Sequence, residues 1–106
     1  MQAKKEIFFE IKTPLNVIIR TTKDYWNYLT GIKHNNMKGK ENIVINTLAD
    51  PDMIRKSKID GKVFLYYKAE ENYLYCAVVK HENRTGFLIT AYITEKAKEG
   101  EIIWTK

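Results

Sequence analysis

The sequence contains few of the residues that cross-link or interrupt a chain: one cysteine, two prolines and five glycines among 106 residues. A single cysteine, Cys76, excludes an internal disulfide and is typical of a reducing cytoplasm. The longest apolar runs have the length of strands, which excludes a transmembrane helix, and the N-terminus has no signal-peptide core. We therefore expect a cytoplasmic protein with no membrane association and with one domain, residues 1–106.

Patterns that hold metals or nucleotides are also missing. Two histidines and one cysteine match no zinc-binding spacing, and the carboxylates are scattered along the chain. Lys38-Gly39-Lys40 is too short to form a phosphate-binding loop. The sequence therefore predicts neither a metal nor a cofactor.

The net charge of +5 favours an acidic partner such as RNA, DNA or an acidic protein. A solvated basic surface without any such partner explains the same charge, so the charge alone does not decide between them.

The first half of the chain predicts a hairpin and two helices. Lys5–Ile11 and Leu15–Thr21 have the composition of strands, and Thr13-Pro14 lies near the turn between them. Thr22 is a good N-cap for an amphipathic helix that ends near His34, and Pro51 stops a second helix. The polar segment 35–40 between the helices is predicted to be a loop.

Strands dominate the second half of the chain. Residues 62–68, 72–80 and 86–94 show the period of two that strands have, with turn residues between them. Residues 96–100 are a short crossing, and residues 101–106 are a last strand. The predicted order is β-β-α-α-β-β-β-β, an α+β fold with an antiparallel sheet and both helices on one face.

Alternation along residues 86–94 divides the side chains between two faces of the sheet. The set that we expect to face the helices is Phe87, Ile89, Ala91 and Ile93. The set that we expect on the open face is Leu88, Thr90, Tyr92 and Thr94. We place Phe64, Tyr66 and Lys68 on the open face as well, because the Lys68 ammonium needs water. A row of hydroxyl groups also reflects ordinary strand propensity on a solvated face, so the row by itself leaves both explanations open.

Several side chains are candidates for chemistry. Lys33 and His34 end the first helix, where the helix dipole stabilises positive charges. A histidine there can also act as a general acid or base. Arg55 and Ser57 lie on a predicted turn after Pro51; the guanidinium can clamp a phosphate, although it can equally be a surface charge. We expect His81 to be exposed at a hairpin turn and Cys76 to be inert packing.

These residues resemble the barnase/EndoU/colicin/RelE-like nuclease superfamily, which includes small bacterial and phage-borne toxin-like domains. The resemblance covers roughly residues 25–106. It rests on Lys33-His34, on the proline-containing turn 50–57, on strands 63–67 and 74–80, and on residues 86–104. It implies a metal-independent endoribonuclease with a RelE- or barnase-like fold whose cleft lies on the open sheet face. Carried over residue by residue, it points at His34, Arg55, Ser57, Thr90 and Tyr92. The catalytic residues that we predict are His34, Arg55, Thr90 and Tyr92, and the substrate-binding residues that we predict are Lys33, Ser57, Tyr66, Lys68 and Thr94.

Three functional hypotheses follow. The first is a ribonuclease that cleaves RNA by attack of the 2′-hydroxyl on the phosphodiester, as the toxin of a toxin–antitoxin pair with an acidic antitoxin as partner. The second is a non-catalytic RNA- or protein-binding module that uses the open polar face. The third is a small interaction protein whose open face docks a partner.

Overall fold

The described part of the chain starts with a β-hairpin. In the computed structural model, which describes residues 6–97 and 99–106, β1 (Ile7–Lys12) pairs antiparallel with β2 (Ile18–Thr22). The N–H of Thr13 donates to the carbonyl of Val17 (2.9 Å) and closes the turn. The predicted hairpin is therefore confirmed, with small shifts at the strand ends. Lys5, with which the predicted first strand began, lies outside the described residues.

Four short helical elements follow the hairpin in the described part of the chain. The helical elements are, in chain order, α1 (Lys23–Tyr28), the π-helical turn η1 (Leu29–Lys33), the 3₁₀ turn η2 (Asn35–Met37) and α2 (Glu41–Ala49). The Oγ1 of Thr22 accepts a hydrogen bond from the N–H of Tyr25 (3.1 Å), which confirms the predicted N-cap. Pro51 lies just beyond α2, as predicted. No helix among the described residues is long and apolar enough to span a membrane.

The sheet is mostly antiparallel and has more strands than expected. After α2 the strands are β3 (Met53–Lys56), β4 (Val63–Glu70), β5 (Tyr73–Glu82), β6 (Thr85–Thr94) and β7 (Glu101–Thr105). Across the described residues, seven strands form one sheet in the order β1-β2-β6-β5-β4-β3-β7. The N-terminal hairpin joins this sheet through parallel pairing of β2 with β6, whereas we expected an entirely antiparallel sheet of six strands.

β3 corrects the prediction that residues 50–57 form a turn. Its residues pair antiparallel with β4 on one side and with β7 on the other. Ile54 is fully buried, while Arg55 and Lys56 give the strand no apolar alternation. Such a short strand is stabilised by pairing with its neighbours, so the β-propensity of its own residues does not predict it. Arg55 therefore lies on a strand, and the strand order gains one strand after the second helix.

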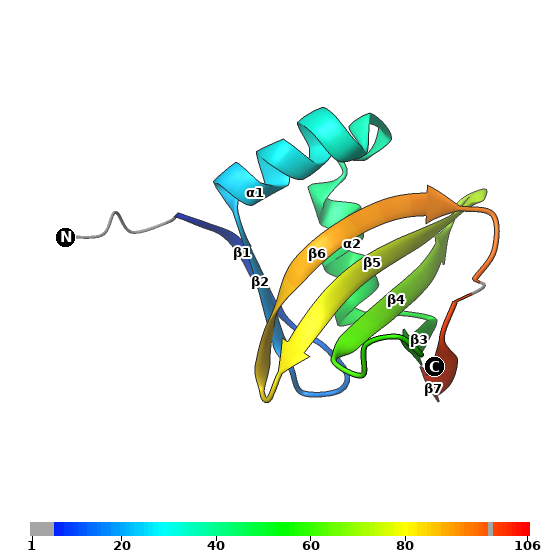
Figure 1. Cartoon of the computed structure of the whole chain (residues 1–106). Helices are drawn as coiled ribbons and strands as arrows, with labels where there is room; N and C mark the ends of the chain where they lie inside the picture. The colour runs from blue at the N-terminus through cyan, green and yellow to red at the C-terminus, as the bar shows by residue number, and fades with distance from the viewer. Residues whose placement is uncertain (1–5, 98) are drawn as a thin grey trace.

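The main core lies between the helices and one face of the sheet. Figure 1 shows α2 behind the curved strands β4, β5 and β6, with α1 above them. Leu48 of α2 and Leu29 of η1 are fully buried in this core. Tyr66, Ala77 and Leu88 come to it from the three curved strands. The prediction that the helices cover one face of an α+β sheet is confirmed.

A smaller cluster occupies the opposite face. Leu65, Tyr67 and Cys76 are buried there, and partly buried side chains such as Tyr92 pack against them. The sequence had suggested that this face is open to water, but the buried cluster covers part of it. The burial of Cys76 agrees with its predicted role in packing.

A β-bulge changes the alternation that we predicted for residues 86–94. Val78 pairs with Thr90 but Val79 pairs with Leu88, so one extra residue is inserted in β6 at Ile89. On the N-terminal side of this bulge Leu88 turns into the core and Phe87 becomes exposed, opposite to the prediction. On its C-terminal side the alternation holds, with Ala91 and Ile93 toward the helices and Tyr92 on the other face.

Side-chain hydrogen bonds connect the turn of the N-terminal hairpin to strands β4 and β5. The hydroxyl of Tyr66 donates to Thr13 Oγ1 (3.0 Å) and lies 3.1 Å from His81 Nε2. The His81 ring stacks on Phe64, with 3.9 Å between ring centroids. His81 is therefore partly buried, and the expectation that it is simply exposed at a turn is wrong. The error arose because β5 continues past the expected end of the strand and carries His81 into the sheet.

We expect this site to make stability depend on pH. Burial lowers the pKa of His81 from 6.5 to about 4. As the pH falls below 6.5, His81 becomes protonated in the unfolded chain, whereas in the folded chain it stays neutral until about pH 4. The free energy of unfolding therefore decreases between pH 6.5 and about pH 4. Urea denaturation at a series of pH values should show this fall.

The matched variants are His81→Gln, which should flatten the curve, and His34→Gln, which should leave the fall in place. A parental curve that matches the His81→Gln curve would contradict the assignment.

Candidate functional site

Four of the predicted site residues meet at one pocket. The pocket has a volume of about 460 Å³ and lies on the sheet face opposite the main core. Its lining residues are His34, Ser57, Val63, Leu65, Val78, Thr90, Tyr92 and Glu99. The polar members come from segments far apart in the chain, so the fold and not sequence proximity brings them together. His34, Ser57, Thr90 and Tyr92 were all predicted.

Backbone bonds on both sides fix His34. Its N–H donates to the carbonyl of Leu29 (2.8 Å), and its own carbonyl accepts from the N–H of Met37 (3.0 Å). Met37 is fully buried, so it anchors a segment that we had expected to be only a polar loop. The His34 ring lies 5.9 Å from the ring of Tyr92, measured between centroids. The residue that follows η1 thus contributes an imidazole to the lining of the pocket.

Thr90 presents an unused hydroxyl group at the pocket. Within the described residues its Oγ1 is buried and has no hydrogen-bond partner. A buried hydroxyl without a partner costs about 1–3 kcal/mol. A ligand that hydrogen-bonds to Thr90 would remove that cost. Thr90 faces the pocket because it pairs with Val78 in the regular half of β6, C-terminal to the bulge, where the predicted alternation holds.

Tyr92 is one of three packed groups whose neutral forms are favoured. Burial, followed by the influence of Cys76, raises the pKa of Tyr92 well above its usual value. Burial raises the pKa of Tyr67 in the same way, and it raises the pKa of the Cys76 thiol to about 12. At neutral pH the Tyr92 phenol therefore keeps its proton. It can donate a hydrogen bond or a proton but cannot act as a base.

Arg55 lies beside the pocket and not in its lining. On β3 it pairs with Leu65, whose side chain forms part of the pocket wall. The Arg55 guanidinium contacts Met53 Sδ (3.2 Å from Nε) and the carbonyl of Gly100 (3.5 Å from Nη1). These contacts hold it against the chain segment that leads into β7. Arg55, which we expected to bind a phosphate, therefore lies near the pocket, but its guanidinium contacts Met53 and Gly100.

Tyr66 and Lys68 point away from this pocket, which corrects our assignment of their face. Tyr66 is fully buried in the main core, and Lys68 Nζ lies 2.8 Å from the carbonyl of Asp50, just beyond α2. The ammonium finds its partners at the end of a helix rather than in water. The residues of β4 that do line the pocket are Val63 and Leu65.

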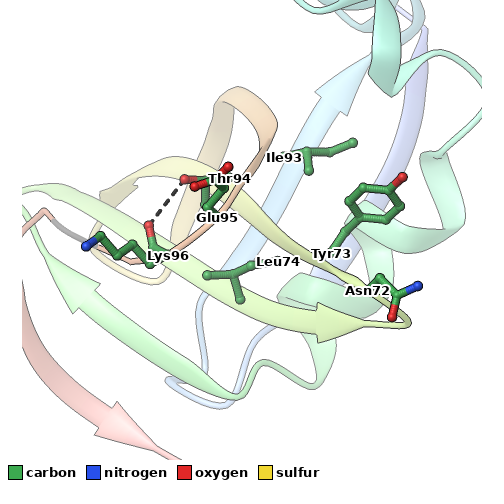
Figure 2. A pocket seen from close by; sticks show the side chains of 7 residues that line it. All are labelled: Asn72, Tyr73, Leu74, Ile93, Thr94, Glu95 and Lys96. Atoms are coloured by element: carbon green, nitrogen blue, oxygen red, sulfur yellow. Dashed lines mark hydrogen bonds between the residues drawn. The ribbon is translucent and has the colours of Figure 1, made fainter.

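Two further predicted residues lie outside the pocket lining. Lys33 is exposed at the end of η1, next to His34 in the chain. Thr94 lies at the end of β6, where its hydroxyl donates to the carbonyl of Lys96 (3.2 Å). Thr94 belongs to a second pocket of about 690 Å³, shown in Figure 2, between the β4–β5 turn and the end of β6. That pocket holds none of the other predicted site residues.

Glu99 is a pocket residue that the sequence did not reveal. Gly100 has φ of +80°, and a Cβ at this position would lie 2.6 Å from the carbonyl oxygen of Lys56. Glycine therefore lets residues 99–100 approach β3 closely, and this places Glu99 at the pocket. The segment 96–100 was expected only as a crossing, and its Lys98 lies outside the described residues. The one available signal was the glycine that follows Glu99.

The pocket thus combines an imidazole, a carboxylate and neutral hydroxyl donors over an apolar floor. An imidazole and a carboxylate together can serve as a general acid and a general base, and hydroxyl groups can donate to a developing negative charge. Comparison of the chain with known protein families, with curated proteins and with solved structures finds no match.

Proposed function

We propose that this protein is an endoribonuclease of the barnase/EndoU/colicin/RelE-like superfamily. The observation that carries the proposal is the meeting of His34, Glu99, Thr90, Tyr92 and Ser57 at one pocket. The net charge of +5 adds a long-range attraction for polyanions. The structure has the predicted α+β class with a mostly antiparallel sheet, although one strand more than expected follows the second helix. The finer RelE- or barnase-like assignment is part of the proposal.

The proposed reaction needs only side chains of the pocket. The 2′-oxygen of the RNA attacks the adjacent phosphorus while the Glu99 carboxylate takes the 2′-hydroxyl proton. The bond from phosphorus to the 5′-oxygen breaks, and protonated His34 gives its proton to that leaving oxygen. The products are a 2′,3′-cyclic phosphate and a 5′-hydroxyl. Thr90 and the neutral Tyr92 phenol donate hydrogen bonds to the phosphate oxygens as their negative charge increases.

The biological setting forms part of the same proposal. A ribonuclease with a basic surface can be held inactive by an acidic protein that covers its site. We therefore propose a cytoplasmic toxin of a toxin–antitoxin pair. A neighbouring gene that encodes a small acidic protein would support this part.

One observation favours a non-catalytic RNA-binding module as the second candidate. None of the described residues that line the pocket is a lysine or an arginine, and Arg55 is engaged with Met53 and Gly100. A site with little positive charge stabilises a pentacoordinate phosphate less well. The module would bind RNA through its basic surface and leave it intact.

Product analysis separates the two candidates. We expect purified protein to cut a labelled RNA in the presence of EDTA and to leave 2′,3′-cyclic phosphate ends. The same RNA with a 2′-deoxy sugar at the cut position should resist, because the attacking oxygen is missing. Fragments with 5′-phosphate ends that disappear in EDTA would contradict the proposed chemistry. Salt-sensitive retention of intact RNA would favour the binding module.

A further inference from the structure

The loop between β3 and β4, residues 57–62, displays an apolar side chain to solvent. Ile59 is 98% exposed. Lys56, which precedes the loop, is exposed, as are Lys58 and Lys62 within it. Isolated apolar side chains are common on protein surfaces, so exposure alone indicates nothing. The structure around Ile59 makes the difference.

Hydrogen bonds within the loop hold Ile59 in this position. Ser57 Oγ accepts from the N–H of Ile59 (3.1 Å) and from that of Asp60 (3.3 Å). Asp60 Oδ1 accepts from the N–H of Lys62 (2.9 Å). The N–H of Ser57 donates to the carbonyl of Val63 (2.9 Å) and closes the loop. The exposure of Ile59 is therefore built into an ordered turn.

The charges around Ile59 remain available to an anionic partner. Within the described residues, Lys56, Lys58 and Lys62 form no ion pair. The one carboxylate of the loop, Asp60, accepts a backbone hydrogen bond instead. The loop thus offers ammonium groups on both sides of an apolar tip. That combination suits a ligand with alternating phosphates and flat apolar groups.

The loop is continuous with the pocket. Ser57, whose hydroxyl orders the loop, also lines the pocket, and so does Val63 at the other end of the loop. A linear ligand that enters the pocket and is longer than it can therefore pass over the loop. A membrane surface fits less well, because one isoleucine side chain offers little apolar area for insertion.

We propose that the β3–β4 loop holds the RNA strand where it leaves the pocket. Lys56, Lys58 and Lys62 contact phosphates, and Ile59 packs against a base that is out of its stack. The inference rests on the proposed function and specifies its substrate as single-stranded RNA longer than the pocket itself. These three lysines and Ile59 contribute affinity and do not take part in the bond-breaking step.

The test measures binding and cleavage separately. Binding of a labelled single strand of about 12 nucleotides should weaken about tenfold in Ile59→Ser, because the apolar contact with a base is lost. It should weaken about tenfold in Lys58→Ala/Lys62→Ala as well, because two phosphate contacts are lost. In the double variant the slope of log affinity against log salt should shrink by about 1.4, since each lost contact to a single strand removes about 0.7. Ile59→Ser should keep the parental slope. Lys12→Ala, on the edge strand β1 at the other end of the sheet, is the matched control and should bind like the parent.

Cleavage kinetics complete the test. Loop variants should raise KM for the long strand, leave kcat unchanged and cut a dinucleotide like the parent. Loop variants that bind the long strand as tightly as the parent would overturn the inference. So would a loss of binding confined to anionic phospholipid vesicles. Loop-dependent binding by a protein that cuts no RNA would support the loop and refute the proposed catalysis.

Discussion

Replacing His34 by alanine is expected to lower the rate of RNA cleavage by about 10²–10⁴-fold. In the proposed reaction this imidazole protonates the leaving 5′-oxygen, and within the described residues no other imidazole lines the pocket. Stability should change little, because the bonds that place residue 34 are made by its backbone N–H and carbonyl. Initial rates on a labelled RNA, together with thermal melting of both proteins, measure the two effects.

His81→Gln is the matched control for this prediction. His81 is the only other histidine of the sequence, and its ring packs on Phe64 and Tyr66 away from the pocket. At pH 7.5, where a buried neutral His81 carries no charge, the His81→Gln protein should cut RNA at the parental rate. Equal activity of His34→Ala and the parent would remove His34 from the site. Glu99→Gln should lower the rate as well, since a carboxamide cannot take a proton.

Replacing Gly86 by alanine is expected to destabilise the fold more than any surface change. A Cβ on Gly86 would lie 2.2 Å from the carbonyl oxygen of Lys80 and 2.9 Å from Ile19 Cδ1. One of these contacts is backbone, so a rotamer change cannot relieve it. Overpacking of this kind costs about 3 kcal/mol. For a domain of this size the melting temperature should fall by about 10 °C or more.

The collision also weakens the junction between the two parts of the sheet. Gly86 pairs with Ile19 in the short parallel ladder that joins β2 to β6. Gly31→Ala is the control, because nothing lies within 4 Å of a Cβ at that position in η1. It should be neutral or slightly stabilising, since alanine has the higher helix propensity. Equal melting temperatures for the two variants would show that β6 adjusts to the extra methyl group.

Local signals in the sequence singled out four of the residues that line the pocket. His34 was placed by the end of an amphipathic pattern, and Thr90 and Tyr92 by the period of two in their strand. Arg55 was expected on a turn, whereas it lies on β3. Its contacts with Met53 and Gly100 depend on the pairing of β3 with β7, which joins segments distant in sequence.

The predictions of sheet faces failed for a different reason. Alternation says which residues of one strand share a face, but it does not say which face a neighbouring strand adds to it. We assigned Lys68 to the open face on its charge, whereas Asp50 at the end of α2 supplies its partner. The bulge at Ile89 then reversed the sides of Phe87 and Leu88. The position of a bulge depends on how two strands pair, and the sequence of one strand alone does not predict that pairing.

The sequence by itself determined the α+β class, the N-cap at Thr22, the stop at Pro51 and the strands that carry strong alternation. These features depend on interactions between residues close in the chain or on the burial of a regular apolar pattern. Only the tertiary structure decided that β3 is a strand, that β2 and β6 pair in parallel, and that Glu99 meets His34 at one pocket. Those features come from contacts between distant segments, whose energies appear only after the chain has folded.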